Sequence, residues 1–203
     1  MKNFIFLVAF SIFPLIGLSQ TEVTTALLDV NNVGITLSNG GVFCARPSTD
    51  IYNDPTIMET PGFEYPKGSG NHLLHGLSMW FGGVNEFDEP RVSVPTRKAY
   101  EDQFSGPLTV NSGHPGYGGW DTEIYSISRE EINYHVTNYQ NPNYVAQESI
   151  YQWPAHGDLG GDFDFYLAPF VDLNGDGYYS PQEGEYPCIQ GDEAVYMILN
   201  DRS

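Results

Sequence analysis

Basic residues are scarce in this sequence. Its 203 residues include 8 lysines and arginines against 26 aspartates and glutamates, a formal net charge of −18. A surface of that sign repels the phosphate backbone, so we expect no nucleic-acid partner. Charged residues make up only 17% and aromatic residues 14%, which excludes a disordered acidic tail and favours a β-rich secreted protein with a substantial core. The excess acid has two interpretations: solubility, or carboxylates that hold divalent cations.

Long apolar runs are also few. The one candidate lies in residues 1–19, where Lys2 precedes an almost wholly apolar run from Phe4 to Leu18. Because that run is short and broken by Pro14, we expect a secretory signal peptide, cleaved before Gln20, and no transmembrane segment afterwards. Residues 20–203 are then expected to form a single β-rich extracellular domain, or the N-terminal part of a longer protein.

Only two cysteines are present, Cys44 and Cys188. In a chain sent to an oxidising compartment they could form one disulfide, closing a long loop. The alternative is two buried thiols that behave as small apolar residues.

Residues 172–183 match a ligand pattern position by position. The pattern D-x-[DN]-x-[DN]-G-x5-E places oxygen ligands at loop positions 1, 3, 5 and 12, a carbonyl at position 7 and a water-mediated ligand at position 9. All these ligands are hard oxygens, which favours Ca2+ over a transition metal. The predicted ligands are Asp172, Asn174, Asp176, Tyr178, Ser180 and Glu183. A simple Asx-rich turn is the alternative, although such a turn does not require the carboxylate at position 12.

The flanks distinguish this EF-hand-type loop from a calcium sensor. Residues 163–171 are aromatic and β-branched and predict a strand, and Gly184 and Pro187 stop any helix after about one turn. A sensor needs a helix on each side, so we expect a structural calcium. Four nearby acids could complete the coordination shell or hold a second ion, and are otherwise loop acids: Asp158, Asp162, Asp164 and Asp192.

Most of the remaining pattern predicts strands. We expect a hairpin that joins 33–37 to 42–44 through Asn39-Gly40-Gly41, with Val33, Ile35 and Leu37 on one face. Further strands are expected at 73–84, which is apolar and predicted to be buried, at 91–100 and at 194–199. Long irregular loops are expected at 46–71 and 103–117. The predicted fold is mainly β, sandwich or jelly-roll-like, with one short α-helix and long irregular loops.

The helix is expected over residues 128–139, where Ser128 and Glu131 have the spacing of a capping box. Its predicted buried stripe comprises Ile132, His135, Val136 and Tyr139, which makes His135 a core-edge residue rather than a ligand. A further helical turn is expected at 147–152. His72 and His75 would face opposite sides of a strand, so no shared metal is expected there.

Several segments together resemble a known family. They are Gly82-Gly83, Glu148-Ser149-Ile150, Trp153-Pro154-Ala155-His156-Gly157 and the stretch from Tyr166 through the loop to Asp201. They resemble the N-terminal region of large secreted surface proteins of Bacteroidetes, whose C-terminal domain directs type IX secretion; the calcium loop is EF-hand-like or dockerin-like. The resemblance implies a location outside a Gram-negative cell, or on its surface, and calcium binding. These 203 residues contain no such sorting domain, so the sequence is expected to be a fragment or a short relative.

The expected function is a calcium-stabilised structural, adhesive or assembly module that binds calcium and other surface proteins or glycans. We expect no enzyme, because a nucleophile elbow, a zinc-binding His/Glu motif and a phosphate loop are missing. The alternative is a carbohydrate-binding module with Trp80, Trp120 or Trp153 as sugar platforms, or a glycan hydrolase. The acid pairs for hydrolysis would be Glu130 with Glu131, or Asp162 with Asp164.

Overall fold

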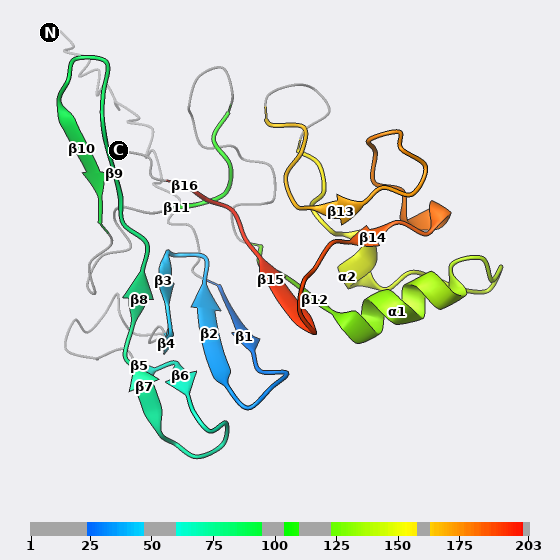
Figure 1. Ribbon diagram of the computed structural model, residues 1–203, viewed down its shortest axis with the longest axis horizontal. Helices are drawn as coiled ribbons and strands as arrows, with labels where there is room; N and C mark the ends of the chain where they lie inside the picture. The colour runs from blue at the N-terminus through cyan, green and yellow to red at the C-terminus, as the bar shows by residue number, and fades with distance from the viewer. Residues whose placement is uncertain (1–23, 47–59, 95–103, 110–122, 158–162, 201–203) are drawn as a thin grey trace, which may run out of the picture.

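The computed structural model describes residues 24–46, 60–94, 104–109, 123–157 and 163–200 (Figure 1). The predicted signal peptide, Asp158, Asp162 and Trp120 lie outside these residues. Within the described ranges no helix has the length and apolar character needed to span a bilayer.

Antiparallel strands dominate the described residues. The largest sheet has four strands in the order β1-β2-β6-β7, which are β1 (Thr25–Leu28), β2 (Gly34–Ser38), β6 (Phe63–Glu64) and β7 (His72–Leu74). The other strands pair in twos: β3 (Val42–Phe43) with β8 (Leu77–Ser78), β4 (Ala45–Arg46) with β5 (Thr60–Pro61), β9 (Phe81–Val84) with β10 (Pro90–Ser93), β11 (Phe104–Ser105) with β16 (Leu199–Asn200), β12 (Tyr125–Ser128) with β15 (Glu193–Tyr196), and β13 (Phe170–Val171) with β14 (Tyr186–Pro187). The prediction of a mainly β fold is confirmed, and the sandwich or jelly-roll arrangement stays a prediction.

The predicted early hairpin forms only in part: the Cys44 N–H donates to the Thr36 carbonyl at 2.8 Å, but the ladders of its two strands are made with other partners. A turn does occupy 39–40, but β2 pairs with β1 and β6, while β3 pairs with β8. β1 is longer than β3, and it pairs with β2 in register from Thr25 opposite Ser38 to Leu28 opposite Ile35. The alternation in β2 is as expected, but its small polar side chains Thr36 and Ser38 are more buried than Ile35 and Leu37.

The segment 73–84 forms strands as predicted, but its predicted burial is wrong. The segment contains β8, β9 and most of β7, and its large apolar side chains are exposed, Leu73 by 64% and Trp80 by 72%. Gly76 lies between β7 and β8, and β9 pairs with β10, whose residues Pro90–Val92 are themselves exposed. An apolar run indicates what a strand could bury, whereas burial itself requires a second packed layer.

The predicted loop at 46–71 is partly wrong, since β5 and β6 lie inside it. Phe63 and Glu64 of β6 pair with both β2 and β7, so this turn-rich segment supplies an inner strand of the largest sheet. Two residues per strand are too few to show a period in the sequence.

The helix prediction is confirmed. Helix α1 (Arg129–Asn138) begins after Ser128, whose Oγ accepts from the Glu131 N–H at 3.2 Å, while the Ser128 N–H donates to Glu131 Oε2 at 2.8 Å. Ile132 and His135 are buried as expected, but Val136 is exposed, because the helix covers the core along one narrow stripe. The predicted helical turn is α2 (Glu148–Tyr151).

The core lies where α1 and α2 meet β12 and β15. Its buried members are Ile127, Ile132, Ile150, Trp153, Ala155 and Ala168. Trp153 is 5% exposed and its indole Nε1–H donates to the Pro169 carbonyl at 3.1 Å. The prediction of Trp153 as an exposed sugar platform is therefore wrong, because the ring fills the core.

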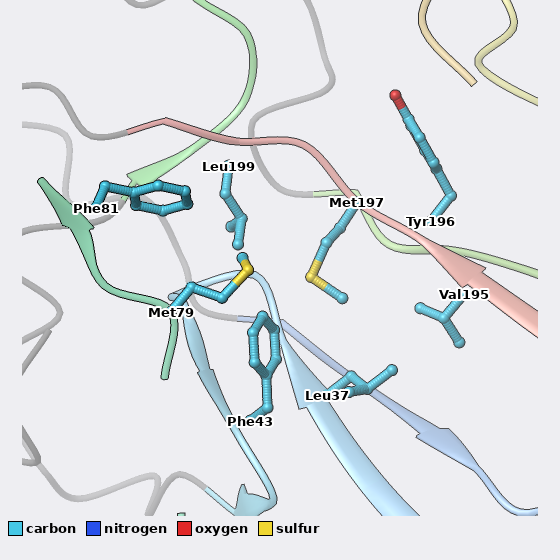
Figure 2. Close-up of a pocket in the computed structure, with 8 residues that line it drawn as sticks. All are labelled: Leu37, Phe43, Met79, Phe81, Val195, Tyr196, Met197 and Leu199. Carbon is cyan, nitrogen blue, oxygen red and sulfur yellow. The ribbon is translucent and has the colours of Figure 1, made fainter. Parts of the chain in front are cut away.

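An open, largely apolar pocket of about 390 Å³ lies between the N-terminal sheet and the last strands (Figure 2). Side chains from three segments converge on it: Leu37 and Phe43, Met79 and Phe81, and Met197 and Leu199.

The disulfide considered for Cys44 and Cys188 is not formed. Cys44 is a buried thiol, and Cys188 is an exposed one. The alternative of two free thiols is therefore correct, but the expectation that both are buried holds only for Cys44. Burial raises the pKa of the Cys44 thiol.

Candidate metal centre

The predicted calcium loop connects β13 to β14, and these two strands pair with each other (Figure 1). Phe170 lies opposite Pro187 and Val171 opposite Tyr186, so the ladder closes the two ends of the loop. The strand predicted at 163–171 is shorter than expected. Within that range the structure has β13 and a single isolated bridge, between Tyr166 and His156. After Ser180 the chain makes one 3-10 turn, η1 (Pro181–Glu183), which ends at Gly184 as expected.

Gly177 occupies the sharp turn at loop position 6. Its φ is +81°, and a Cβ there would lie 2.7 Å from the Tyr166 hydroxyl oxygen. The left-handed backbone favours glycine, as the pattern predicted, and a Cβ would in addition displace the exposed Tyr166 side chain.

The carboxylate of Asp172 holds the loop backbone. Its Oδ1 accepts from the Gly175 N–H at 2.6 Å and its Oδ2 from the Gly177 N–H at 2.8 Å. The Gly177 hydrogen bond, helped by that of Gly175, lowers the pKa of Asp172 against the opposing effect of desolvation. The group is therefore a carboxylate at neutral pH.

Asn174 connects two further predicted ligands. Its Nδ2 donates to Asp176 Oδ2 at 3.0 Å and to Glu183 Oε2 at 2.6 Å. Its Oδ1 accepts from the Asp176 N–H at 2.8 Å, and Asp176 Oδ1 accepts from the Tyr178 N–H at 2.8 Å. Positions 3, 5 and 12 of the loop are thus joined through one side-chain amide.

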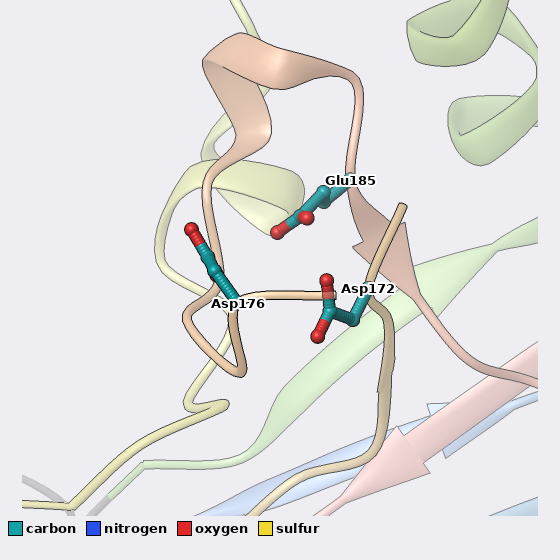
Figure 3. A group of neighbouring side chains, drawn as sticks. All are labelled: Asp172, Asp176 and Glu185. Carbon is teal, nitrogen blue, oxygen red and sulfur yellow. The ribbon is translucent and has the colours of Figure 1, made fainter. Parts of the chain in front are cut away.

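Glu185 is a member of the site that sequence reasoning missed. One oxygen each from Asp172, Asp176 and Glu185 lie within 4.8 Å of one another (Figure 3). Glu185 is fully buried; its Oε1 accepts from the Leu173 N–H at 3.0 Å and its Oε2 from the Ser180 N–H at 2.7 Å. Glu185 lies two residues beyond the 12-residue pattern. The only sign of it in the sequence was an acidic residue immediately before the strand that closes the loop.

The other predicted ligands lie around this cluster. Glu183 is exposed and reaches the loop through Asn174. Tyr178 is the predicted carbonyl ligand, and the centroid of its ring lies 5.3 Å from that of Phe165. The backbone N–H of Ser180 donates to Glu185 Oε2. Of the acids considered for a second ion, Asp164 and Asp192 are exposed and belong to no such cluster among the described residues.

The loop is anchored to the core on two sides. On one side the Tyr179 N–H donates to His156 Nε2 at 2.8 Å, and the Tyr179 hydroxyl donates to the Ile150 carbonyl at 2.7 Å. On the other, His135 Nε2 lies 3.1 Å from the Glu185 carbonyl oxygen. His135 is therefore the core-edge residue that the helical stripe predicted, satisfied by hydrogen bonds and not a ligand.

Comparison of the chain with protein-family models, with curated proteins and with solved structures finds no match. The resemblance to type IX-secreted surface proteins accordingly stays a prediction.

Proposed function

We propose that this chain is a calcium-stabilised, secreted cell-surface module with a structural, adhesive or assembly role, and that it performs no catalysis. The observation that supports this best is that Asp172 and Asp176, two ligands of the calcium pattern, lie close to the carboxylate of Glu185, two residues beyond the pattern. Their oxygens are the hard donors that Ca2+ prefers, so the donor set fits this ion.

Two ligand sets are consistent with this loop. The sequence pattern selects the exposed Glu183 as the two-oxygen ligand, whereas the geometry groups the buried Glu185 with Asp172 and Asp176. Both oxygens of Glu185 already accept backbone hydrogen bonds, although each carboxylate oxygen has a second lone pair. In either set, a bound cation would offset the repulsion between neighbouring carboxylates.

The role proposed for calcium is structural. The loop lies between two paired strands and is fixed to α1 and α2 by His135 and Tyr179, so it is held as one rigid junction. A ligand that binds only the folded state stabilises it by RT ln(1 + [L]/Kd), about 2.7 kcal/mol at one hundred times Kd. Extracellular modules bind calcium with Kd of roughly 10⁻⁴ to 10⁻³ M, which suits calcium-rich surroundings outside a cell.

Thermal unfolding with calcium and with a chelator tests the proposal. At a calcium concentration near one hundred times Kd, we expect a stabilisation of roughly 2–3 kcal/mol, which should raise the melting temperature of the wild type by several degrees. Asp172→Ala should abolish that increase. Asp192→Asn is the matched control, since it removes one exposed carboxylate outside the cluster and should keep the full increase. An identical melting temperature with and without calcium would refute the calcium site.

Glu183→Gln and Glu185→Gln distinguish the two ligand sets. Calorimetric titration with Ca2+ should show at least a tenfold loss of affinity, about 1.4 kcal/mol, for the variant that removes a true ligand. Glu185→Gln also places an amide NH2 against backbone N–H donors and should lower the stability of the calcium-free protein. Glu183→Gln, on an exposed side chain, should not.

The location is tested in a type IX-secreting bacterium. We expect the protein expressed from the full reading frame, with an internal tag, to be cleaved by protease added to intact cells. The variant without residues 1–19 should stay in the cytoplasm, protected from the protease. Protection of the undeleted protein would contradict a surface location.

A further inference from the structure

A groove lined by three tyrosines lies where α1 and α2 approach η1. Its volume is about 530 Å³, within the range of roughly 300–1,000 Å³ usual for small-molecule sites. Tyr139, Tyr144 and Tyr151 supply rings, and Glu148, Pro181 and Gln182 contribute to the walls. None of these residues is a predicted ligand of the metal centre.

Two of the tyrosine rings are held in place. Tyr139 packs flat against Gly184, where a Cβ would lie 2.7–2.9 Å from its ring carbons, and its hydroxyl accepts from Gln140 Nε2 at 3.0 Å. The Tyr144 hydroxyl lies 3.1 Å from His135 Nδ1. Tyr151 is 64% exposed and offers most of its ring to solvent. The groove therefore combines preorganised apolar faces with one open ring.

Polar groups border these rings. The Glu148 carboxylate accepts from Gln152 Nε2 at 2.8 Å, which orients it and leaves it further acceptor capacity. Gln182 adds an amide that both donates and accepts. Among the described residues the lining includes an acid and no basic residue, so the lining repels a phosphorylated or carboxylated ligand. By contrast, the pocket in Figure 2 has one polar side-chain group among its labelled residues, the Tyr196 hydroxyl, and its other labelled side chains are apolar.

We propose that this groove binds a neutral saccharide. A pyranose ring has apolar C–H faces that pack on tyrosine rings, and hydroxyl groups at its edge that hydrogen-bond to carboxylate and amide groups. Its chemistry thus matches the two kinds of group found here. Among the tryptophans first considered as sugar platforms, Trp153 is buried and Trp80 is exposed but outside the groove, so the tyrosine rings are the platforms proposed here.

The test is binding of uncharged glycans to the intact protein at constant calcium. A glycan array identifies the best neutral oligosaccharide, and isothermal titration measures its affinity for wild type and variants. Tyr151→Ala and Gln182→Ala should each weaken binding about tenfold, the effect of losing about 1.4 kcal/mol of stacking or hydrogen bonding. Trp80→Ala is the matched control, because Trp80 is an exposed aromatic residue outside the groove, and binding should be unchanged.

Three results would overturn the assignment. They are the absence of any neutral glycan ligand, binding that survives both groove variants, and loss of binding in Trp80→Ala alone. Tetramethylammonium is titrated in parallel, and its binding in preference to sugars would assign the groove to cations instead. The melting temperature of each variant confirms that it folds, and the calcium response of Tyr151→Ala separates failure here from failure of the calcium site.

Discussion

The imidazole of His135 joins helix α1 to the end of the acidic loop, with Nε2 3.1 Å from the carbonyl oxygen of Glu185. Since a carbonyl only accepts, Nε2 carries the proton and Nδ1 is left to accept from the Tyr144 hydroxyl at 3.1 Å. Burial lowers the pKa of His135, against the smaller opposing effect of the Glu185 hydrogen bond, and favours this neutral form. One fully buried side chain thus links the helix, the groove and the loop.

His135→Ala should destabilise the protein by about 2–4 kcal/mol, because it opens a cavity and leaves the Glu185 carbonyl without its donor. Urea unfolding monitored by circular dichroism measures the change. Val136→Ala, one residue further along α1 but exposed, should change stability by less than about 0.5 kcal/mol. Equal effects of the two substitutions would show that His135 does not hold the helix to the loop.

Glu131 should give stability that depends on pH. Burial alone would raise its pKa, but hydrogen bonds from Ser128 and Ser149 outweigh burial and lower it. A carboxyl whose pKa is lower in the folded state contributes stability above its unfolded value, near 4.5, and loses it as pH falls through the folded value. Unfolding should therefore become easier as pH falls below about 4.5.

Glu131→Gln should cost about 1–2 kcal/mol at pH 7 and flatten the pH dependence in that window. Glu130→Gln is the control, since Glu130 lies in the same first turn but is exposed. A pH profile that both variants alter equally would mean that only the charge at the helix N-terminus matters.

Gly184→Ala should destabilise the end of the loop by about 1–3 kcal/mol, because its φ of +93° disfavours a side chain and a Cβ would overlap the Tyr139 ring. Gly68→Ala separates the two causes, since Gly68 has a φ of +81° and nothing within 4 Å of its added Cβ. Thermal unfolding of both variants should show the larger loss for Gly184. Similar losses would mean that backbone conformation alone accounts for the effect.

The two thiols should differ in reactivity. Cys188 is exposed, whereas Cys44 is buried and burial raises the pKa of its thiol, so less of the reactive thiolate forms. With Ellman's reagent at pH 8, one thiol should react at once and the second only after unfolding. A protein that shows no free thiol when denatured without reductant would contain the disulfide that the structure lacks.

Local features were predictable where a short motif determines them. The capping box at Ser128 and Glu131 formed because its atoms are three residues apart on one turn. The turn at Gly177 and the end of η1 at Gly184 formed because glycine accepts those left-handed backbone angles without steric cost. The apolar run at 73–84 was predictable as strand but not as exposed, since exposure depends on which layers lie nearby.

The sequence by itself determined a mainly β chain, one capped helix and an oxygen-rich loop at 172–183, because propensity, capping and loop chemistry act between residues close in the chain. Only the tertiary structure decided that Glu185 joins Asp172 and Asp176, that Trp153 fills the core, and that three tyrosines share a groove. Those relationships depend on strand pairing and helix packing, which bring together residues whose spacing in the sequence carries no sign that they meet.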